Sequence, residues 1–482
     1  MSFISLDFAV FLPLVFILYW FFFNKNARHQ NFLVVVASFF FYSCWDWRFL
    51  ALIVASILID YSIGVLLSKQ KNHFKRKILL GISISSNLGL LAFFKYFNFF
   101  VENFVASFSF FGMNLDGPSL NIILPVGISF YTFQTLSYTF DIYKEKLKPT
   151  LDILSFAAFV SFFPQLVAGP IERASNFLPQ FFKKRTFNYL HAVDGLRQIL
   201  WGLFKKIVIA NNCAVLANKI FANYNHLSGS SLLIGAVFFA FQIYGDFSGY
   251  SDIAIGSSRL FGLNLKENFK FPYFSRDIAE FWRRWHISLS SWFKSYLYIP
   301  LGGSRGSQLT TIRNVFLVFI VSGFWHGANW TFLFWGFFHA VLFIPYMLLN
   351  RNRKNLDVVA KGKLFPSLKE LFSMICTFSF VTIAWIFFRS KSIGQAMNYI
   401  SGIFSDSLFS FPDCSDLRGV FYTSCLIVLF LVIEWLGREN QYGIEKLGLK
   451  WPRISRYIMY MVIIISLFML GGKDQQFIYF QF

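Results

Sequence analysis

From Asn314 to Asn350 the sequence reads NVFLVFIVSGFWHGANWTFLFWGFFHAVLFIPYMLLN, 37 residues without one Asp, Glu, Lys or Arg. A helix rises about 1.5 Å per residue and needs about 20 apolar residues to cross roughly 30 Å of hydrocarbon. This stretch is therefore long enough for a pair of membrane spans. Its solid apolar character disfavours a transmembrane β-barrel, whose strands show about ten-residue segments of alternating polarity.

The rest of the 482-residue chain has the same character, since 56% of its residues are hydrophobic and only 14% are charged. Soluble domains carry about 25% charged residues, so this chain lacks the polar surface that water requires. We expect an all-α polytopic protein with one membrane-embedded domain over residues 1–482 and roughly eleven to thirteen spans. The other predicted spans are Leu6 to Phe23, Asn31 to Cys44, Phe49 to Leu67, Ile78 to Phe100, Asn121 to Tyr143, Val193 to Phe221, Ser231 to Gly256, Leu371 to Phe388, Arg418 to Trp435 and Tyr457 to Leu470.

The segment from Leu151 to Phe187 is interrupted by Pro164, Pro170 and Pro179. Irregular backbone at membrane depth is tolerated only where it is buried in protein or lines a cavity. The sequence therefore predicts a re-entrant or interfacial segment here rather than a simple span.

The net charge of +20 would suggest nucleic acid in a soluble protein, but here the excess lies in short loops between apolar blocks. Basic residues stay on the cytoplasmic side of a membrane. The loops at Lys69–Lys77 and Lys144–Lys148 are therefore predicted to be cytoplasmic, and the amino terminus periplasmic. No Lys or Arg precedes Lys25, so the first apolar block is predicted to be a retained span rather than a signal peptide. We therefore expect membrane lipid around the protein and no nucleic-acid partner.

The five cysteines are isolated and form no CxxC pair, so neither structural zinc nor a disulfide framework is indicated. The chain also lacks a phosphate-binding GxxxxGK[ST] loop, an HExxH zinc site, a GxSxG elbow and a GxGxxG fingerprint. We therefore expect no metal and no tightly bound cofactor.

Asp277 to Ile299 is predicted to be one amphipathic helix, because its apolar residues follow the helical period, and it should lie at the membrane interface or enter the membrane only partway. Within it, Arg283 and Arg284 are candidates for binding phosphate groups, which guanidinium pairs with in a bidentate manner. His286 lies at the edge of the apolar face. The alternative is a basic helix resting on anionic lipid headgroups.

His326 lies in the motif GFWHGANW, within the uncharged stretch. Desolvation favours the neutral imidazole, which is a competent base. Gly323 and Gly327 flank it and would let another segment or a ligand approach the backbone closely. The alternative is a histidine that is hydrogen-bonded between helices. For His339, packing or aromatic contact is the expected role.

Asp246 and Asp252 are carboxylates inside another apolar block, in QIYGDFSGYSDIAIG. They stand six residues apart and so do not face each other on one helix as a general acid and base would. Two interpretations stay open, a structural polar network and a cavity lining. Glu172 and Arg173 are expected to anchor a loop.

The sequence resembles the membrane-bound O-acyltransferase family at FWRRWHISLS (Phe281 to Ser290), SYLYIPLGG (Ser295 to Gly303) and GFWHGANWTFLFWG (Gly323 to Gly336). It is most similar to the bacterial branch that contains the alginate O-acetyltransferase subunit and the D-alanyl transfer protein of teichoic acid synthesis. Similar motifs are PVGISFYTFQTLSYTFDIY (Pro125 to Tyr143), FFPQLVAGPIER (Phe162 to Arg173), QIYGDFSGYSDIAIG and the terminal FIYFQF (Phe477 to Phe482).

The resemblance implies a helical body around a tunnel, with His326 as general base and His286 as the second catalytic histidine. It also implies an acyl thioester donor, such as acetyl-CoA, on the cytoplasmic side of a bacterial inner membrane. The acceptor would be a hydroxyl of an extracytoplasmic polysaccharide such as alginate, with a separate periplasmic partner resembling SGNH hydrolases. The alternatives are D-alanyl transfer to a teichoic acid-like polymer and a polysaccharide or lipid transporter without chemistry.

Overall fold

The computed structural model describes residues 1–110, 113, 120, 122–167 and 169–478. This part of the chain contains α-, 3-10 and π-helices and no β-strand, which confirms the all-helical fold class. It forms two compact units, Met1–Tyr189 with Ser258–Leu265 and Leu190–Ser257 with Lys266–Phe482, and each is described by itself. Asn121, at the edge of a predicted span, Ala168 of the motif FFPQLVAGPIER, and residues 479–482 of the terminal motif lie outside the described residues. The single domain over residues 1–482 stays a prediction.

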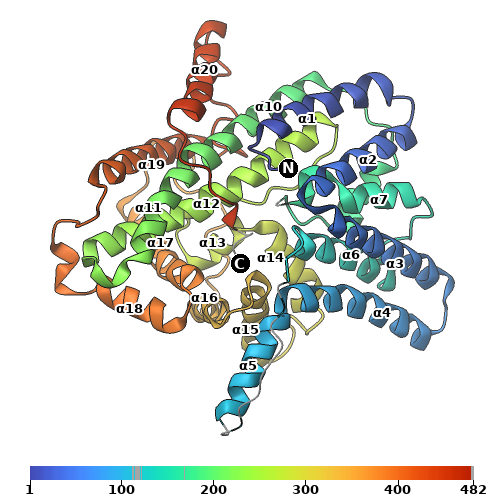
Figure 1. Ribbon diagram of the computed structural model, residues 1–482, viewed down its shortest axis with the longest axis horizontal. Coiled ribbons are helices and arrows are strands. Elements are labelled where there is room, and N and C mark those ends of the chain that lie inside the picture. The colour runs from blue at the N-terminus through green and yellow to red at the C-terminus, as the bar shows by residue number, and fades with distance from the viewer. Residues whose placement is uncertain (111–112, 114–119, 121, 168, 479–482) are drawn as a thin grey trace. The chain divides into compact units, whose positions relative to one another are not determined.

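In the first unit, long helices fill most of the predicted spans, and shorter helices follow them (Figure 1). The predicted break between Leu151 and Phe187 is confirmed as a series of short helices, with Pro164 and Pro179 in the first turns of two of them. The α-helices are α1 Leu6–Ile17, α2 Ala27–Asp46, α3 Leu50–Lys69, α4 His73–Leu91, α5 Phe97–Phe110, α6 Ile128–Tyr143, α7 Ile153–Ser161, α8 Phe163–Leu166 and α9 Ala174–Phe177.

Arg76 links two loops of the first unit that the basic residues assign to the same side of the membrane. Its guanidinium donates to the backbone oxygen of Tyr143 at 2.8 Å and lies 3.5 Å from the carboxylate of Glu145. The loop between α3 and α4 and the loop after α6 therefore meet at one end of the unit. This is the arrangement that the predicted topology requires.

The second unit contains the later helices and every residue predicted to take part in chemistry. Here α15 and α16 lie side by side, and α20 projects from the rest of the unit (Figure 1). The α-helices are α10 Tyr189–Leu203, α11 Asn211–Ala222, α12 Gly229–Leu260, α13 Ile278–Arg284, α14 Ile287–Phe293, α15 Gln308–His326, α16 Trp330–Leu348, α17 Leu368–Arg389, α18 Ile393–Ile403, α19 Leu417–Gly437 and α20 Arg453–Met469. The last residues of α12, from Ser258 on, belong to the first unit.

By length and composition, eight helical stretches of the described residues could cross a membrane, so the chain is a multi-pass membrane protein. One of them, Ala27–Lys69, joins α2 and α3 and contains two of the predicted spans. Others that we predicted, at Leu6–Phe22, α6 and α20, form helices of 16 or 17 residues. The total of eleven to thirteen spans stays a prediction, whereas the predicted pair between Asn314 and Asn350 is confirmed as α15 and α16.

Two glycines allow α15 and α16 to pack backbone to backbone. A Cβ added at Gly323 would lie 2.2 Å from the carbonyl oxygen of Phe332, and one added at Gly336 would lie 2.3 Å from that of Phe319. Only residues without a side chain permit this approach. The close approach expected at Gly323 is thus made by the neighbouring helix, and it fixes the position of the loop between the two helices.

Candidate active site

His326 is the last residue of α15, directly before that loop. Its side chain is buried, and its ring centroid lies 4.9 Å from Trp325, 5.1 Å from Trp335 and 5.3 Å from Phe388. The rings of Trp335 and Phe388 come from α16 and α17, so three helices enclose the imidazole. The imidazole is buried among aromatic rings, which agrees with the desolvation expected inside an uncharged stretch.

His286 lies where the predicted helix is broken. One continuous helix over Asp277 to Ile299 is wrong: α13 ends at Arg284, α14 begins at Ile287, and His286 adopts φ 43° and ψ 53°. The left-handed region is uncommon for a residue with a side chain and interrupts the helical hydrogen bonds. The neighbouring segment replaces them, because the backbone N–H of Ile287 donates to the oxygen of Asn268 at 2.9 Å.

Asn268 also fixes the tautomer of His286. Both the backbone N–H and the hydroxyl of Ser288 donate to the side-chain oxygen of Asn268, at 3.4 and 2.8 Å, so this atom is an acceptor. Nδ1 of His286 lies 3.0 Å from the same oxygen and must therefore carry the hydrogen of their hydrogen bond. Nε2 keeps its lone pair, and no hydrogen-bond partner for it is found among the described residues.

The two histidines lie near each other although 40 residues separate them in sequence. Their ring centroids are 6.4 Å apart with the planes inclined by 56°, and Trp325 lies 5.9 Å from His286. His286 is outside the helical stretches that could span a membrane, and burial lowers its pKa to about 3. It is thus a neutral imidazole at neutral pH. The arrangement provides two nitrogen bases in one enclosed aromatic site.

Arg283 and Arg284, the predicted phosphate-binding residues, both contact the chain itself. Arg284 pairs with Glu280 at 2.7 Å and is buried. Arg283 donates to the backbone oxygens of Asn352 and Asn355 at 2.5 and 2.7 Å. The sequence analysis had offered a basic surface helix on lipid headgroups as the alternative. In the structure both side chains instead bind groups of the chain itself. A role in phosphate binding stays a prediction.

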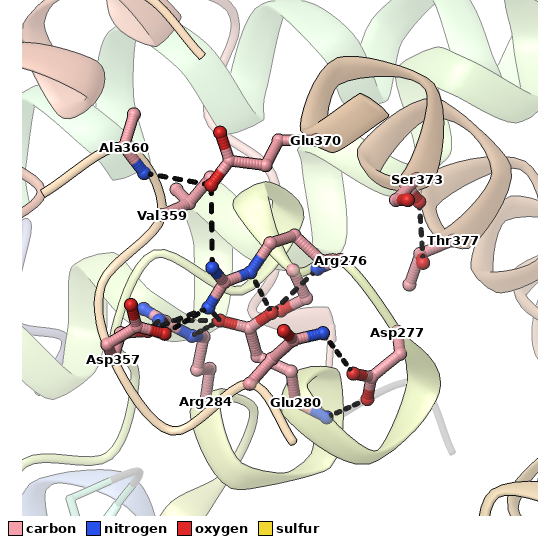
Figure 2. Close-up of polar contacts among 12 residues, drawn as sticks. Arg276, Asp277, Glu280, Arg284, Asp357, Val359, Ala360, Glu370, Ser373 and Thr377 are labelled. Carbon is pink, nitrogen blue, oxygen red and sulfur yellow. Dashed lines mark hydrogen bonds and ion pairs between the residues drawn. The ribbon is translucent and has the colours of Figure 1, made fainter. Parts of the chain in front are cut away.

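Arg276 is a central residue of this region that the sequence analysis missed. Figure 2 shows it between three carboxylates, at 3.1 Å from Glu280, 2.9 Å from Asp357 and 3.5 Å from Glu370. These acids belong to α13, to the loop after α16 and to the first turn of α17. The cluster therefore fixes the start of α13 against its neighbours. The spacing of Arg276 and Glu280, four residues apart, is the only signal of it in the sequence.

The carboxylates of α12 form a structural polar network, one of the two interpretations that the sequence left open. Asp246 pairs with Lys206 at 2.8 Å, and Asp252 pairs with Lys205 at 2.5 Å. Both lysines lie in a π-helical turn, η5 Phe204–Ala210, between α10 and α11. Two adjacent lysines inside a predicted span were the signal for these pairs, and the sequence analysis overlooked it.

His339 has the packing role that was expected. It is fully buried, its ring lies 4.8 Å from Trp335 and 4.9 Å from Trp282, and it stacks on Phe281. The indole N–H of Trp282 donates to Nδ1 of His339 at 3.3 Å. This hydrogen bond joins α13 to α16 and supports the helix that leads to His286.

His286 and His326 both lie in the part of the chain that matches a known protein family. Residues 2–376 match the model of MBOAT, the membrane-bound O-acyltransferase family. The chain is 35% identical to the probable alginate O-acetylase AlgI of Pseudomonas putida, covering 98% of each protein. It is 33% identical to the peptidoglycan O-acetyltransferase of Helicobacter pylori, covering 98% of this chain and 95% of that protein.

A more distant relative is the teichoic acid D-alanyltransferase of Bacillus subtilis. It is 29% identical over 57% of this chain and 71% of its own length. The family match covers most of the chain and agrees with the multi-pass helical fold. The protein therefore belongs to the membrane-bound O-acyltransferase family and is an acyltransferase of the membrane.

Proposed function

We propose that the protein transfers an acetyl group from a cytoplasmic thioester, acetyl-CoA, to a hydroxyl group for the O-acetylation of an extracytoplasmic polysaccharide such as alginate. The observation that supports this most is the pair of buried histidines with ring centroids 6.4 Å apart. The relatives named alginate O-acetylase and peptidoglycan O-acetyltransferase support acetylation of a polysaccharide.

In the proposed step, the hydroxyl oxygen of the acceptor attacks the carbonyl carbon of the thioester while His326 accepts the hydroxyl proton. The carbon–sulfur bond breaks, and the proton passes from His326 to the departing thiolate, so that an ester and free CoA are formed. General base catalysis of this kind is typically worth about 10²- to 10⁴-fold in rate. His286, with the lone pair of Nε2 free of a partner in the described part of the chain, is the second base of the site.

The acceptor hydroxyl is proposed to belong either to the sugar itself or to a serine of a periplasmic partner resembling SGNH hydrolases. Such a partner would complete delivery to the polymer on the outside of a bacterial inner membrane. The donor binds as a substrate, so the proposal includes no resident cofactor. Direct transfer is favoured over an acyl-enzyme, because no nucleophilic side chain of this chain is compelling.

The proposal is tested by CoA release from acetyl-CoA by the purified protein with and without acceptor. We expect release only when the acceptor or partner is present, and loss of release in His326→Ala with little change in detergent stability. His339→Ala is the control, because its effect should fall on packing more than on turnover. Transfer retained by a well-folded His326→Ala protein would refute the mechanism.

Transfer of D-alanine from a carrier protein is the second candidate, favoured by the partial match to the teichoic acid D-alanyltransferase. It predicts turnover with a D-alanyl-loaded carrier and none with acetyl-CoA. A transporter without chemistry predicts no release of CoA under any condition. CoA release from acetyl-CoA together with turnover of a D-alanyl-loaded carrier therefore separates the three functions.

A further inference from the structure

Lys206 and Asp246 form an ion pair that is almost completely buried, with side chains 1% and 2% exposed. Removing two charges from water costs several kcal/mol per ion unless further hydrogen bonds satisfy them. In this protein the additional hydrogen bonds come from a single distant segment, Gly472–Ile478. The pair therefore does more than join two helical elements, because it also binds the backbone of this segment.

Three hydrogen bonds to its backbone hold the segment, and the side-chain amide of Asn218 donates a longer one to Oε1 of Gln475 at 3.4 Å. The ammonium of Lys206 donates to the backbone oxygen of Gln475 at 3.0 Å, and the backbone N–H of Ile478 donates to the carboxylate of Asp246 at 2.8 Å. The backbone N–H of Gly472 donates to the oxygen of Ile207 at 3.2 Å. The cation and the anion of the pair thus each bind one backbone group of the segment.

The segment reaches the neighbourhood of His286 through a series of rings. Phe477 is 1% exposed, and its centroid lies 4.4 Å from Tyr250 and 6.1 Å from Phe247. Phe247 in turn meets His286 edge to face at 4.7 Å, with an interplanar angle of 88°. Since Phe247 follows Asp246 in sequence, the same turn of α12 holds the segment and supports the histidine.

We propose that the segment Gly472–Ile478, clamped by the Lys206–Asp246 pair, is a positioning element for His286 that acts through Phe477 and Phe247. The proposal deepens the proposed function, since it takes His286 as part of the acyl-transfer site. In this proposal, the contact with Phe477 keeps the ring of Phe247 in place against the imidazole. A misplacement of about 1 Å at a catalytic group can cost on the order of 100-fold in rate.

The clamp is tested first without activity, by hydrogen–deuterium exchange of the full chain in detergent. In Asp246→Ala we expect peptides covering 472–478 to exchange roughly 10-fold faster or more, the effect of losing a hydrogen bond to a charged group. Asp252→Asn is the matched control, because Asp252 pairs with Lys205 and its printed contacts do not include the segment. Unchanged exchange in Asp246→Ala, or an equal increase in Asp252→Asn, would overturn the clamp.

The positioning role is tested by acetyl-CoA turnover under saturating acceptor. Phe477→Ala should lower kcat roughly 10-fold or more and leave KM for acetyl-CoA within about twofold, because donor binding is not altered. Phe477→Leu, which keeps an apolar side chain, should restore most of kcat, and the exposed Gln476→Ala should match the unaltered protein.

A native kcat in Phe477→Ala would overturn the positioning role, and so would a loss of turnover that Phe477→Leu does not relieve. If the unaltered protein releases no CoA with any acceptor, the proposed function fails instead. The exchange data would still decide whether the pair holds the segment. The two failures are therefore distinguishable.

Discussion

At the scale of single residues, the neutral state of His286 has a consequence for stability. Its pKa is lowered to about 3 in the folded protein, against about 6.5 when the chain is unfolded. Between these values the unfolded state binds a proton that the folded state does not, so stability falls as the pH falls. We expect a slope of up to about 1.4 kcal/mol per pH unit from this residue between pH 6.5 and 3, and none above pH 6.5.

This dependence is measured by thermal unfolding in detergent across pH 4 to 8, comparing the native protein with His286→Asn. Below pH 6.5 the native protein should lose stability relative to His286→Asn as the pH falls, and above pH 6.5 the difference should be constant. Asn268→Asp is the informative second variant, because a carboxylate beside Nδ1 raises the pKa of His286 and reduces the slope. A difference curve that is flat with pH would show that the pKa of His286 is the same in the folded and the unfolded protein, and would contradict the lowered pKa.

The two arginines beside His286 make a second prediction. If they help to gather the phosphates of the donor, Arg283→Ala and Arg284→Ala should raise KM for acetyl-CoA by on the order of 10- to 150-fold and leave kcat nearly unchanged. Acetyl-CoA titration under saturating acceptor measures this. Since Arg284 also neutralises the buried Glu280, its variant should lose more thermal stability than Arg283→Ala. If both variants keep the native KM for acetyl-CoA, neither arginine binds the phosphates of the donor, and their role is confined to contacts within the chain.

Individual residues show how far sequence reasoning reaches. The motif around His326 correctly predicted a buried histidine, because the 37 residues from Asn314 to Asn350 contain no charged residue. It did not identify Asn268, since a hydrogen bond between residues 18 positions apart across a broken helix leaves no periodic signal. Nor did it find that Arg276 pairs with Asp357, 81 residues away.

At the scale of secondary-structure elements, the contact between α15 and α16 determines where His326 lies. In Gly323→Ala the new methyl would meet the carbonyl oxygen of Phe332 at 2.2 Å, so the helices must separate. We expect the loss of stability typical of over-packing, about 1 to 3 kcal/mol, together with a clear loss of turnover. Thermal unfolding and CoA release measure the two effects.

Gly81→Ala is the control for this substitution. Gly81 lies within α4, and nothing lies within 4 Å of its added Cβ. Alanine is favoured over glycine in a helix by about 1 kcal/mol, so this variant should be as stable as the native protein or slightly more stable. Equal behaviour of the two variants would mean that the helices tolerate separation.

Elements were predicted well where a long apolar run decides them and poorly where one residue interrupts a pattern. The apolar spacing over Asp277 to Ile299 fits a single helix, yet the left-handed backbone of His286 divides it into α13 and α14. Periodicity cannot detect such a break, because the residues on both sides keep their helical spacing. The hydrogen bonds of the segment at 268–270, which stabilise the break, come from outside the pattern.

At the scale of the whole molecule, the prediction concerns orientation. The amino terminus should be periplasmic, with Lys69–Lys77 and Lys144–Lys148 facing the cytoplasm. A cysteine placed at Lys75 in a background without native cysteines should resist an impermeant maleimide in whole cells and react after permeabilisation. Because Arg76 contacts Tyr143 and Glu145, a cysteine at Lys146 should behave in the same way. Strong labelling of either position from outside would reverse the topology.

The segment Gly472–Ile478 also has a consequence in time. Lys206 precedes its partner Gln475 by 269 residues, and Asp246 precedes its partner Ile478 by 232 residues. During synthesis, α10 to α12 must enter the membrane long before the ribosome has made the segment. Until then the ion pair lacks its hydrogen bonds to Gln475 and Ile478, and Phe247 lacks its contact with Phe477. If the segment positions His286 as proposed, the nascent protein cannot reach its final catalytic geometry until Gly472–Ile478 has been synthesised.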